Sequence, residues 1–93
     1  MADVRQVLER AAADPRLRTA SAFRVLIMMA PELDALEFRS VKQLRLVAAT
    51  RMHKTRVHYA LKQLVAAEFI ERRLEQNGMT VKYRFGRAAV DQR

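Results

Sequence analysis

The sequence predicts a mainly α-helical domain that ends in a small β-hairpin. Apolar residues recur at helical spacing in four successive segments up to about residue 67, and the pattern changes to strict alternation between residues 70 and 85. Asn77-Gly78, the pair most typical of a tight hairpin turn, stands between the two alternating runs. The 93 residues, half of them apolar, provide material for one modest core, so we expect a single domain, 1–93.

The N-terminal segment, residues 1–13, is expected to form a short helix. Its apolar residues fall on one helical face: Val4, Val7, Leu8 and Ala11. This face makes the N-terminal helix a candidate dimer element. Packing of the same face against the chain's own core is the alternative.

A second helix is predicted to begin at Asp14-Pro15, with Asp14 as the N-cap and Pro15 as the first helical residue. We expect it to run to about Ala30 and to stop at Pro31, because proline interrupts a helix. Its second half is apolar on nearly every side, which places it at the centre of the domain.

Two further helices are predicted after a connection in which residues 36–39 could form a very short strand. Residues 40–43 have the spacing of a capping box, and a third helix should follow and end near Thr50, with an apolar face made of Val41, Leu44, Val47 and Ala48. After a tight connection at Arg51-Met52, a fourth helix should cover residues 53–67 and bury Val57, Ala60, Leu61 and Leu64.

A two-residue turn at Asn77-Gly78 sets the pairing of the hairpin. It places Ile70 opposite Phe85 and Leu74 opposite Val81, so that apolar and polar residues sort onto opposite faces. The polar face sets Arg73 opposite Lys82, an unfavourable pair of like charges. Either a bound anion such as DNA phosphate offsets this repulsion, or the two side chains separate into water.

This order of elements matches a helix-turn-helix followed by a two-stranded wing. Residues 44–85 resemble a bacterial winged helix-turn-helix of the multiple-antibiotic-resistance-repressor kind, through "LRLVAATRMHKTRVHYALKQLVAAEFIERR" and the hairpin end "VKYRFG". The upstream "DPRLRTASAFRVLIMMAPELD" is similar to the opening of winged-helix domains in phage and plasmid replication or regulatory proteins. The resemblance covers residues 14–86. It implies a helical core over 14–67, a wing over 68–86 and a tail over 87–93.

Two positions depart from that pattern. Relatives often have glycine in the turn between the two helices and at the end of the recognition helix, where φ is positive, whereas this chain has Arg51 and Glu68. Keeping the left-handed conformation there costs roughly 1 kcal/mol per residue. Either both turns are rebuilt or packing absorbs that cost.

The net charge of +8 is concentrated in the second half of the chain. Residues 1–40 carry six basic and six acidic residues, which leaves twelve of the 18 basic and four of the 10 acidic residues for 41–93. No acidic residue occurs between Glu37 and Glu68. This asymmetry favours an anionic partner over the general basicity of many small proteins.

The helix over residues 53–67 is the expected DNA-reading element. Its outward face carries hydroxyl, phenol, amine, guanidinium and imidazole groups with no acid, which suits the major groove. Base contacts are expected from Thr55, Arg56, His58 and Tyr59, with Arg56 reading guanine. Phosphate contacts are expected from Lys42, Arg45, Arg51, Lys54 and Lys62, and from the wing residues Arg73, Lys82 and Arg84.

Several other classes are not expected. The chain has no cysteine, and His53 and His58 are five positions apart, about 140° around a helix, so no metal or other cofactor is expected. No glycine-rich phosphate loop, nucleophile elbow or convergent carboxylate pair indicates an enzyme. No run of about 20 apolar residues and no signal peptide occur, which favours a cytoplasmic protein, bacterial or phage-encoded, without membrane contact.

The sequence therefore favours a regulator of transcription that binds double-stranded DNA, a repressor acting by occupancy. Residues 70–85 would lie on the backbone or in the minor groove, and a homodimer through the N-terminal helix would double the contacts on a palindrome. Two alternatives are a DNA-binding module in phage or plasmid replication and a winged helix that docks another protein.

Overall fold

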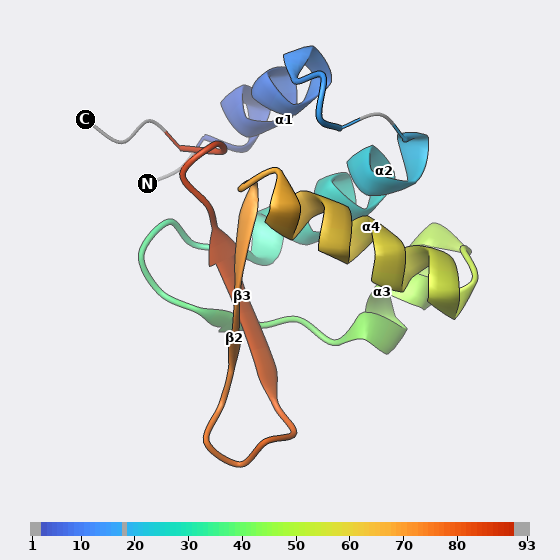
Figure 1. Cartoon of the computed structure of the whole chain (residues 1–93), viewed down its shortest axis with the longest axis vertical. Coiled ribbons are helices and arrows are strands. Elements are labelled where there is room, and N and C mark those ends of the chain that lie inside the picture. Colours follow the sequence, from blue (N-terminus) through green and yellow to red (C-terminus); the bar gives the residue numbers. More distant parts are fainter. Residues whose placement is uncertain (1–2, 18, 91–93) are drawn as a thin grey trace.

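The computed structural model describes residues 3–17 and 19–90. Its elements are α1 (Val4–Ala13), α2 (Ala20–Met29), the 3-10 helix η1 (Ala30–Glu32), β1 (Arg39–Ser40), α3 (Gln43–Thr50), α4 (Lys54–Ala66), β2 (Ile70–Leu74) and β3 (Val81–Phe85). The helices pack together and the β2–β3 hairpin projects away from them (Figure 1). This arrangement confirms the predicted fold class, a mainly α-helical winged helix-turn-helix with a small hairpin.

The segment between α1 and α2 is a turn, so the predicted helix start at Asp14 is wrong. The Asp14 carboxylate accepts a hydrogen bond from the Arg16 backbone N–H at 2.8 Å and pairs with the Arg16 guanidinium at 3.0 Å. These bonds to Arg16 hold the pKa of Asp14 below its usual value. Thr19 caps α2 instead, because its hydroxyl accepts from the Ala22 N–H at 3.3 Å. Residue 18, part of the predicted helix, lies outside the described residues.

The predicted end of α2 is confirmed, because Ala30 is the C-cap of the α-helix and directly precedes Pro31. The α-helix ends at Met29, and the chain continues through Pro31 in the 3-10 helix η1, where the Leu33 N–H bonds to the Ala30 carbonyl at 3.2 Å. Proline is tolerated there because the first residues of a helix need no N–H partner. The α-helix therefore stops before Pro31, as predicted, and one short 3-10 turn follows it.

Helix α3 turns a partly different face to the core than the sequence predicted. Ser40 belongs to β1, and the N-cap is Lys42 without a side-chain cap bond, so the predicted capping box is absent. Leu46 and Thr50 are buried, whereas Leu44 is 73% exposed. Thr50 can be buried because its hydroxyl donates to the Leu46 carbonyl at 2.6 Å. Half of the predicted face is correct: Val41 is buried, although it precedes the helix, and Val47 packs against the core, whereas Leu44 and Ala48 are exposed.

The three strands form an antiparallel sheet in the order β1-β3-β2. The hairpin register is the predicted one, with Ile70 opposite Phe85 and Leu74 opposite Val81. The connection is longer than the predicted two-residue turn: the Gly78 N–H bonds to the Glu75 carbonyl at 2.9 Å. Gly78 has a φ of 74°, which suits glycine. The expected short strand at 36–39 appears as β1 at Arg39–Ser40.

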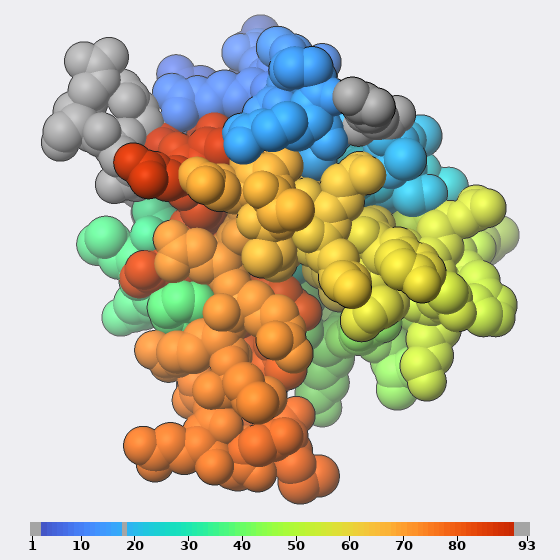
Figure 2. All heavy atoms as spheres, in the orientation of Figure 1, coloured from blue at the N-terminus to red at the C-terminus, as the bar shows by residue number. Residues whose placement is uncertain are grey.

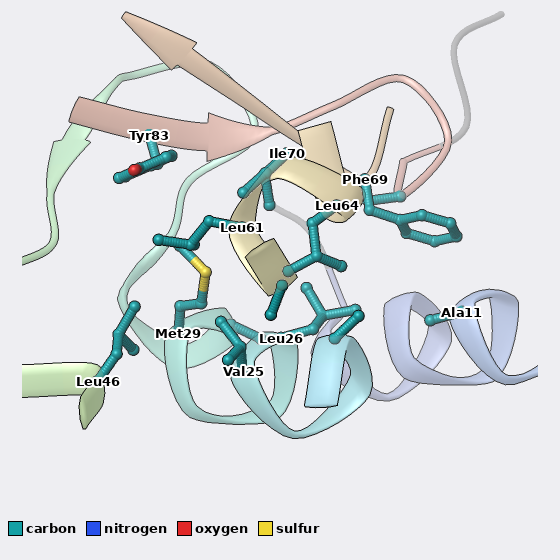
Figure 3. Close-up of a cluster of buried hydrophobic side chains, with 14 of the residues drawn as sticks. Ala11, Val25, Leu26, Met29, Leu46, Leu61, Leu64, Phe69, Ile70 and Tyr83 are labelled. Carbon is teal, nitrogen blue, oxygen red and sulfur yellow. The ribbon is translucent and has the colours of Figure 1, made fainter. Parts of the chain in front are cut away.

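The hydrophobic core lies between α2, α4 and the base of the hairpin (Figure 3). The predicted inward face of α4 is confirmed, since Val57, Ala60, Leu61 and Leu64 are all buried. Val7 and Ala11 of α1 are buried in the same core, and Val4 and Leu8 pack against it. The apolar face of α1 is therefore used within its own domain. Residues 1–2 of the predicted N-terminal helix and 91–93 of the predicted tail lie outside the described residues.

Among the described residues, no helix combines the length and the apolar character needed to span a bilayer.

Candidate nucleic-acid interface

The connection between α3 and α4 keeps the left-handed geometry that the sequence resemblance implied. Arg51 has φ 57° and ψ 29°, and Glu68, after α4, has φ 65°. The Arg51 N–H bonds to the Val47 carbonyl at 2.9 Å, and the Arg24 guanidinium donates to the Thr50 carbonyl at 2.7 Å. These bonds satisfy the end of α3 and hold the turn without glycine.

Glycine at either left-handed position is expected to raise the free energy of unfolding by about 1 kcal/mol, because it removes the steric cost of a side chain at positive φ. Glu68→Gly and Arg51→Gly should both show this in urea denaturation. Loss of stability in both variants would contradict the left-handed assignment.

Helix α4 begins with a histidine cap. The Nδ1 atom of His53 accepts a hydrogen bond from the Thr55 N–H at 3.1 Å, so this histidine caps the helix. His58 lies elsewhere, in edge contact with Tyr59 at 5.8 Å between ring centroids. Within the described part of the chain, no group of three histidine, cysteine or acidic residues could hold a metal ion.

Helix α4 exposes all four predicted base-contact residues. Thr55, Arg56, His58 and Tyr59 are all exposed, and Tyr59 is 63% exposed. Helix α4 runs across the near face of the molecule (Figure 2). Residues 54–66 include no acid, so the exposed face of the helix is suited to an anionic partner.

A groove of about 880 Å³ separates α4 from the hairpin. Figure 2 shows this hollow between the orange hairpin and the green residues at the start of α3. The charged residues that line the groove are all basic. Two of its apolar lining residues, Leu44 and Met79, are largely exposed to solvent, at 73% and 86%. The basic side chains that can meet an anion there are Lys42, His58, Lys62 and Arg72.

Arg72 is a groove cation that the sequence reasoning did not select. It is paired with Tyr83 across the ladder and is exposed on the side of the hairpin that faces α4. Burial raises the pKa of Tyr83, and the charge of Arg72 partly opposes this. The signal was present in the sequence, because Arg72 interrupts an otherwise apolar alternation between Ile70 and Leu74.

The opposite, outer side of the hairpin already supplies its own negative charge. Glu75 lies between Arg73 and Lys82, with 2.9 Å from the Arg73 Nε and 3.6 Å from the Lys82 Nζ to its carboxylate oxygens. This arrangement corrects both expectations for the Arg73–Lys82 pair: a bound anion is not needed, and the two cations do not separate into water.

The Arg84 guanidinium also has partners within the chain. Its Nε and Nη2 donate to one Glu71 oxygen at 3.1 and 2.9 Å, and its Nη1 donates to the Leu36 carbonyl at 2.8 Å. The Phe38 ring has the guanidinium groups of Arg73 and Arg84 each 4.4 Å from its centroid. All three wing cations expected at phosphates therefore have partners within the chain.

Of the five other residues expected to contact phosphate, one has an ion-pair partner and four do not. Arg45 pairs with Glu32 at 2.7 Å. Over residues 3–17 and 19–90, no ion pair involves the other four: Lys42, Arg51, Lys54 and Lys62. These four lie on or beside α3, α4 and the groove, where they adjoin the predicted base-contact residues.

Comparisons of the chain with protein-family models, with curated proteins and with solved structures found no match.

Proposed function

We propose that this protein binds double-stranded DNA through α4 and the adjoining groove and that it regulates transcription, as a repressor acting by occupancy in the cytoplasm of a bacterium or an infected cell. One observation carries the proposal: the exposed face of α4 and the groove beside it form a continuous surface with several unpaired cations and no acidic residue. Such a surface attracts the phosphate backbone and releases its condensed counterions.

The shape of the surface fits a duplex in a definite orientation. An α-helix fits the major groove of B-DNA, so α4 would present Thr55, Arg56 and Tyr59 to base edges. One phosphate strand would then run along the groove between α4 and the hairpin. The cations beside its path are Lys42, Arg51, Lys54, Lys62 and Arg72.

Selection of genomic DNA fragments with the purified protein, followed by footprinting, tests this proposal. A selected palindrome near a promoter is the expected outcome for a repressor. Repeated sites at an origin would instead support a replication module. Failure to select any DNA would contradict the proposal.

One observation favours protein docking as the second candidate. Leu44 and Met79 expose apolar side chains at the mouth of the groove, and phosphate gives them no favourable contact. An acidic partner with apolar side chains would use both features of the groove. Such a partner protein would bind to the groove in the absence of DNA.

Arg72 and Arg73 provide a matched test of which side of the hairpin meets DNA. They are neighbours on β2 and lie on opposite faces of the sheet. Arg72→Ala should weaken binding about fivefold and reduce the salt dependence by about one phosphate contact. Arg73→Ala should change binding less than twofold, because Glu75 already neutralises Arg73. Titration of labelled DNA by fluorescence anisotropy measures both, and the reverse order would contradict the assigned orientation.

A further inference from the structure

The outer face of the hairpin holds a carboxylate where a DNA phosphate would otherwise bind. The Glu75 side chain, only 26% exposed, has one oxygen 2.9 Å from the Arg73 Nε and the other 3.6 Å from the Lys82 Nζ. Backbone pairing fixes its position, because the Glu75 N–H donates to the Thr80 carbonyl at 2.9 Å. The single carboxylate of Glu75 thus forms ion pairs with two cations, Arg73 and Lys82.

The Arg73 side chain has a second contact within the chain, an aromatic ring. The Arg73 guanidinium stacks on Phe38, whose ring also contacts Arg84, and Arg84 is bound by Glu71 and the Leu36 carbonyl. The pKa of Glu75 is lowered, chiefly by its hydrogen bond from Arg73, so the carboxylate stays ionised at neutral pH. Arg73 and Lys82 therefore keep their internal partner under the conditions in which DNA is bound.

The surfaces on the two sides of the hairpin differ in charge. The groove on one side brings Arg72 of the hairpin together with Lys42 and Lys62 from outside it, with no acid among the residues that line it. The outer side balances three cations against two carboxylates, which leaves it close to neutral. A hairpin placed in a minor groove has one sugar-phosphate strand on each side, so these two faces would meet different strands.

We propose that Glu75 acts as an internal substitute for a backbone phosphate: by occupying Arg73 and Lys82 it confines the hairpin's electrostatic contact to the one DNA strand in the groove. This inference rests on the proposed DNA-binding function and adds a residue that limits affinity. Fewer sequence-independent contacts mean weaker binding to non-specific DNA, which leaves discrimination to the residues of α4.

The test is Glu75→Gln, which keeps the size of the side chain, removes its charge and replaces one of the two acceptor oxygens with a donor NH2 group. Freed Arg73 and Lys82 should each add about 0.9 to the magnitude of the slope of log affinity against log salt. The affinity for random-sequence DNA at low salt should rise several-fold. Arg73→Ala in the Glu75→Gln background should remove about half of the increase in slope.

The matched control is Glu9→Gln on α1. It makes the same charge change at an exposed residue that pairs only with Arg5 in the described structure. If wild-type protein binds DNA and Glu75→Gln gives the slope of Glu9→Gln, the inference is overturned while the proposed function stands. If wild-type protein binds no DNA, both are overturned. Thermal unfolding checks the hairpin, and Glu75→Ala gives the same readout if the glutamine variant is destabilised.

Discussion

Replacing Gly86 with alanine is expected to lower the free energy of unfolding by about 3 kcal/mol, at the upper end of the usual cost of overpacking. A Cβ atom at Gly86 would lie 2.2 Å from the Glu68 carbonyl oxygen and 2.8 Å from its carbon. Both are backbone atoms, so no flexible side chain can move aside. The Gly86 N–H also bonds to the Phe69 carbonyl at 2.9 Å, which ties the end of β3 to the start of β2.

Gly78→Ala is the matched control for this substitution. Gly78 has a φ of 74° and open space around its Cβ position, so alanine there should cost only about 1 kcal/mol. Urea denaturation of the two variants measures the difference. Equal losses at Gly86 and Gly78 would show that the close approach to Glu68 does not constrain the junction of α4 and the hairpin.

Arg56→Ala is expected to reduce affinity for the selected DNA site by roughly 10- to 100-fold, or about 1–3 kcal/mol, the discrimination of one bidentate base contact. Arg56 is exposed near the start of α4, where a helix in the major groove reaches base edges. Loss of that contact should relax the preference for guanine at one position and leave binding to random DNA nearly unchanged.

Arg87→Ala is the control, because Arg87 is an exposed arginine beyond β3 that lies 3.9 Å from Glu68 and is not among the residues that line the groove. Binding curves for the selected site and for each single-base variant of it separate the two roles of Arg56. Uniform weakening on all sequences, with a smaller salt slope, would assign Arg56 to a phosphate and not to a base.

The features predicted most accurately from the sequence were those fixed by local patterns. The inward face of α4 follows from helical spacing alone, and the hairpin register follows from alternation around Asn77-Gly78. The left-handed conformations of Arg51 and Glu68 were one of two alternatives that the family resemblance left open, since nothing in those residues favours positive φ.

The errors arose where a side chain or a distant segment overrides local preference. Asp14 binds its neighbour Arg16 and does not cap a helix. The buried residues of α3 are Leu46 and Thr50, and the spacing of apolar residues cannot reveal the burial of Thr50, which is polar. The pairing of Arg45 with Glu32 was also missed, because it depends on tertiary structure: the two residues are thirteen positions apart in the sequence.

The outer face of the hairpin was partly predictable. The correct register already placed Glu75 on the same face as Arg73 and Lys82, next to both. The pairing of Arg84 with Glu71 across the strands was visible in the same register. The stacking of Arg73 on Phe38 could not be predicted, because Phe38 belongs to the connection before β1 and is far from Arg73 in the sequence.

The salt dependence of DNA binding by the wild-type protein tests the central claim most directly. Among the described residues, six cations around α4 and the groove take part in no ion pair; Arg56 is assigned to a base, and the other five are assigned to phosphates: Lys42, Arg51, Lys54, Lys62 and Arg72. With about five phosphate contacts per bound chain, the slope of log affinity against log salt concentration should be about −4 to −5. A slope near zero, or no binding to duplex DNA at low salt, would contradict the assignment of this surface to DNA.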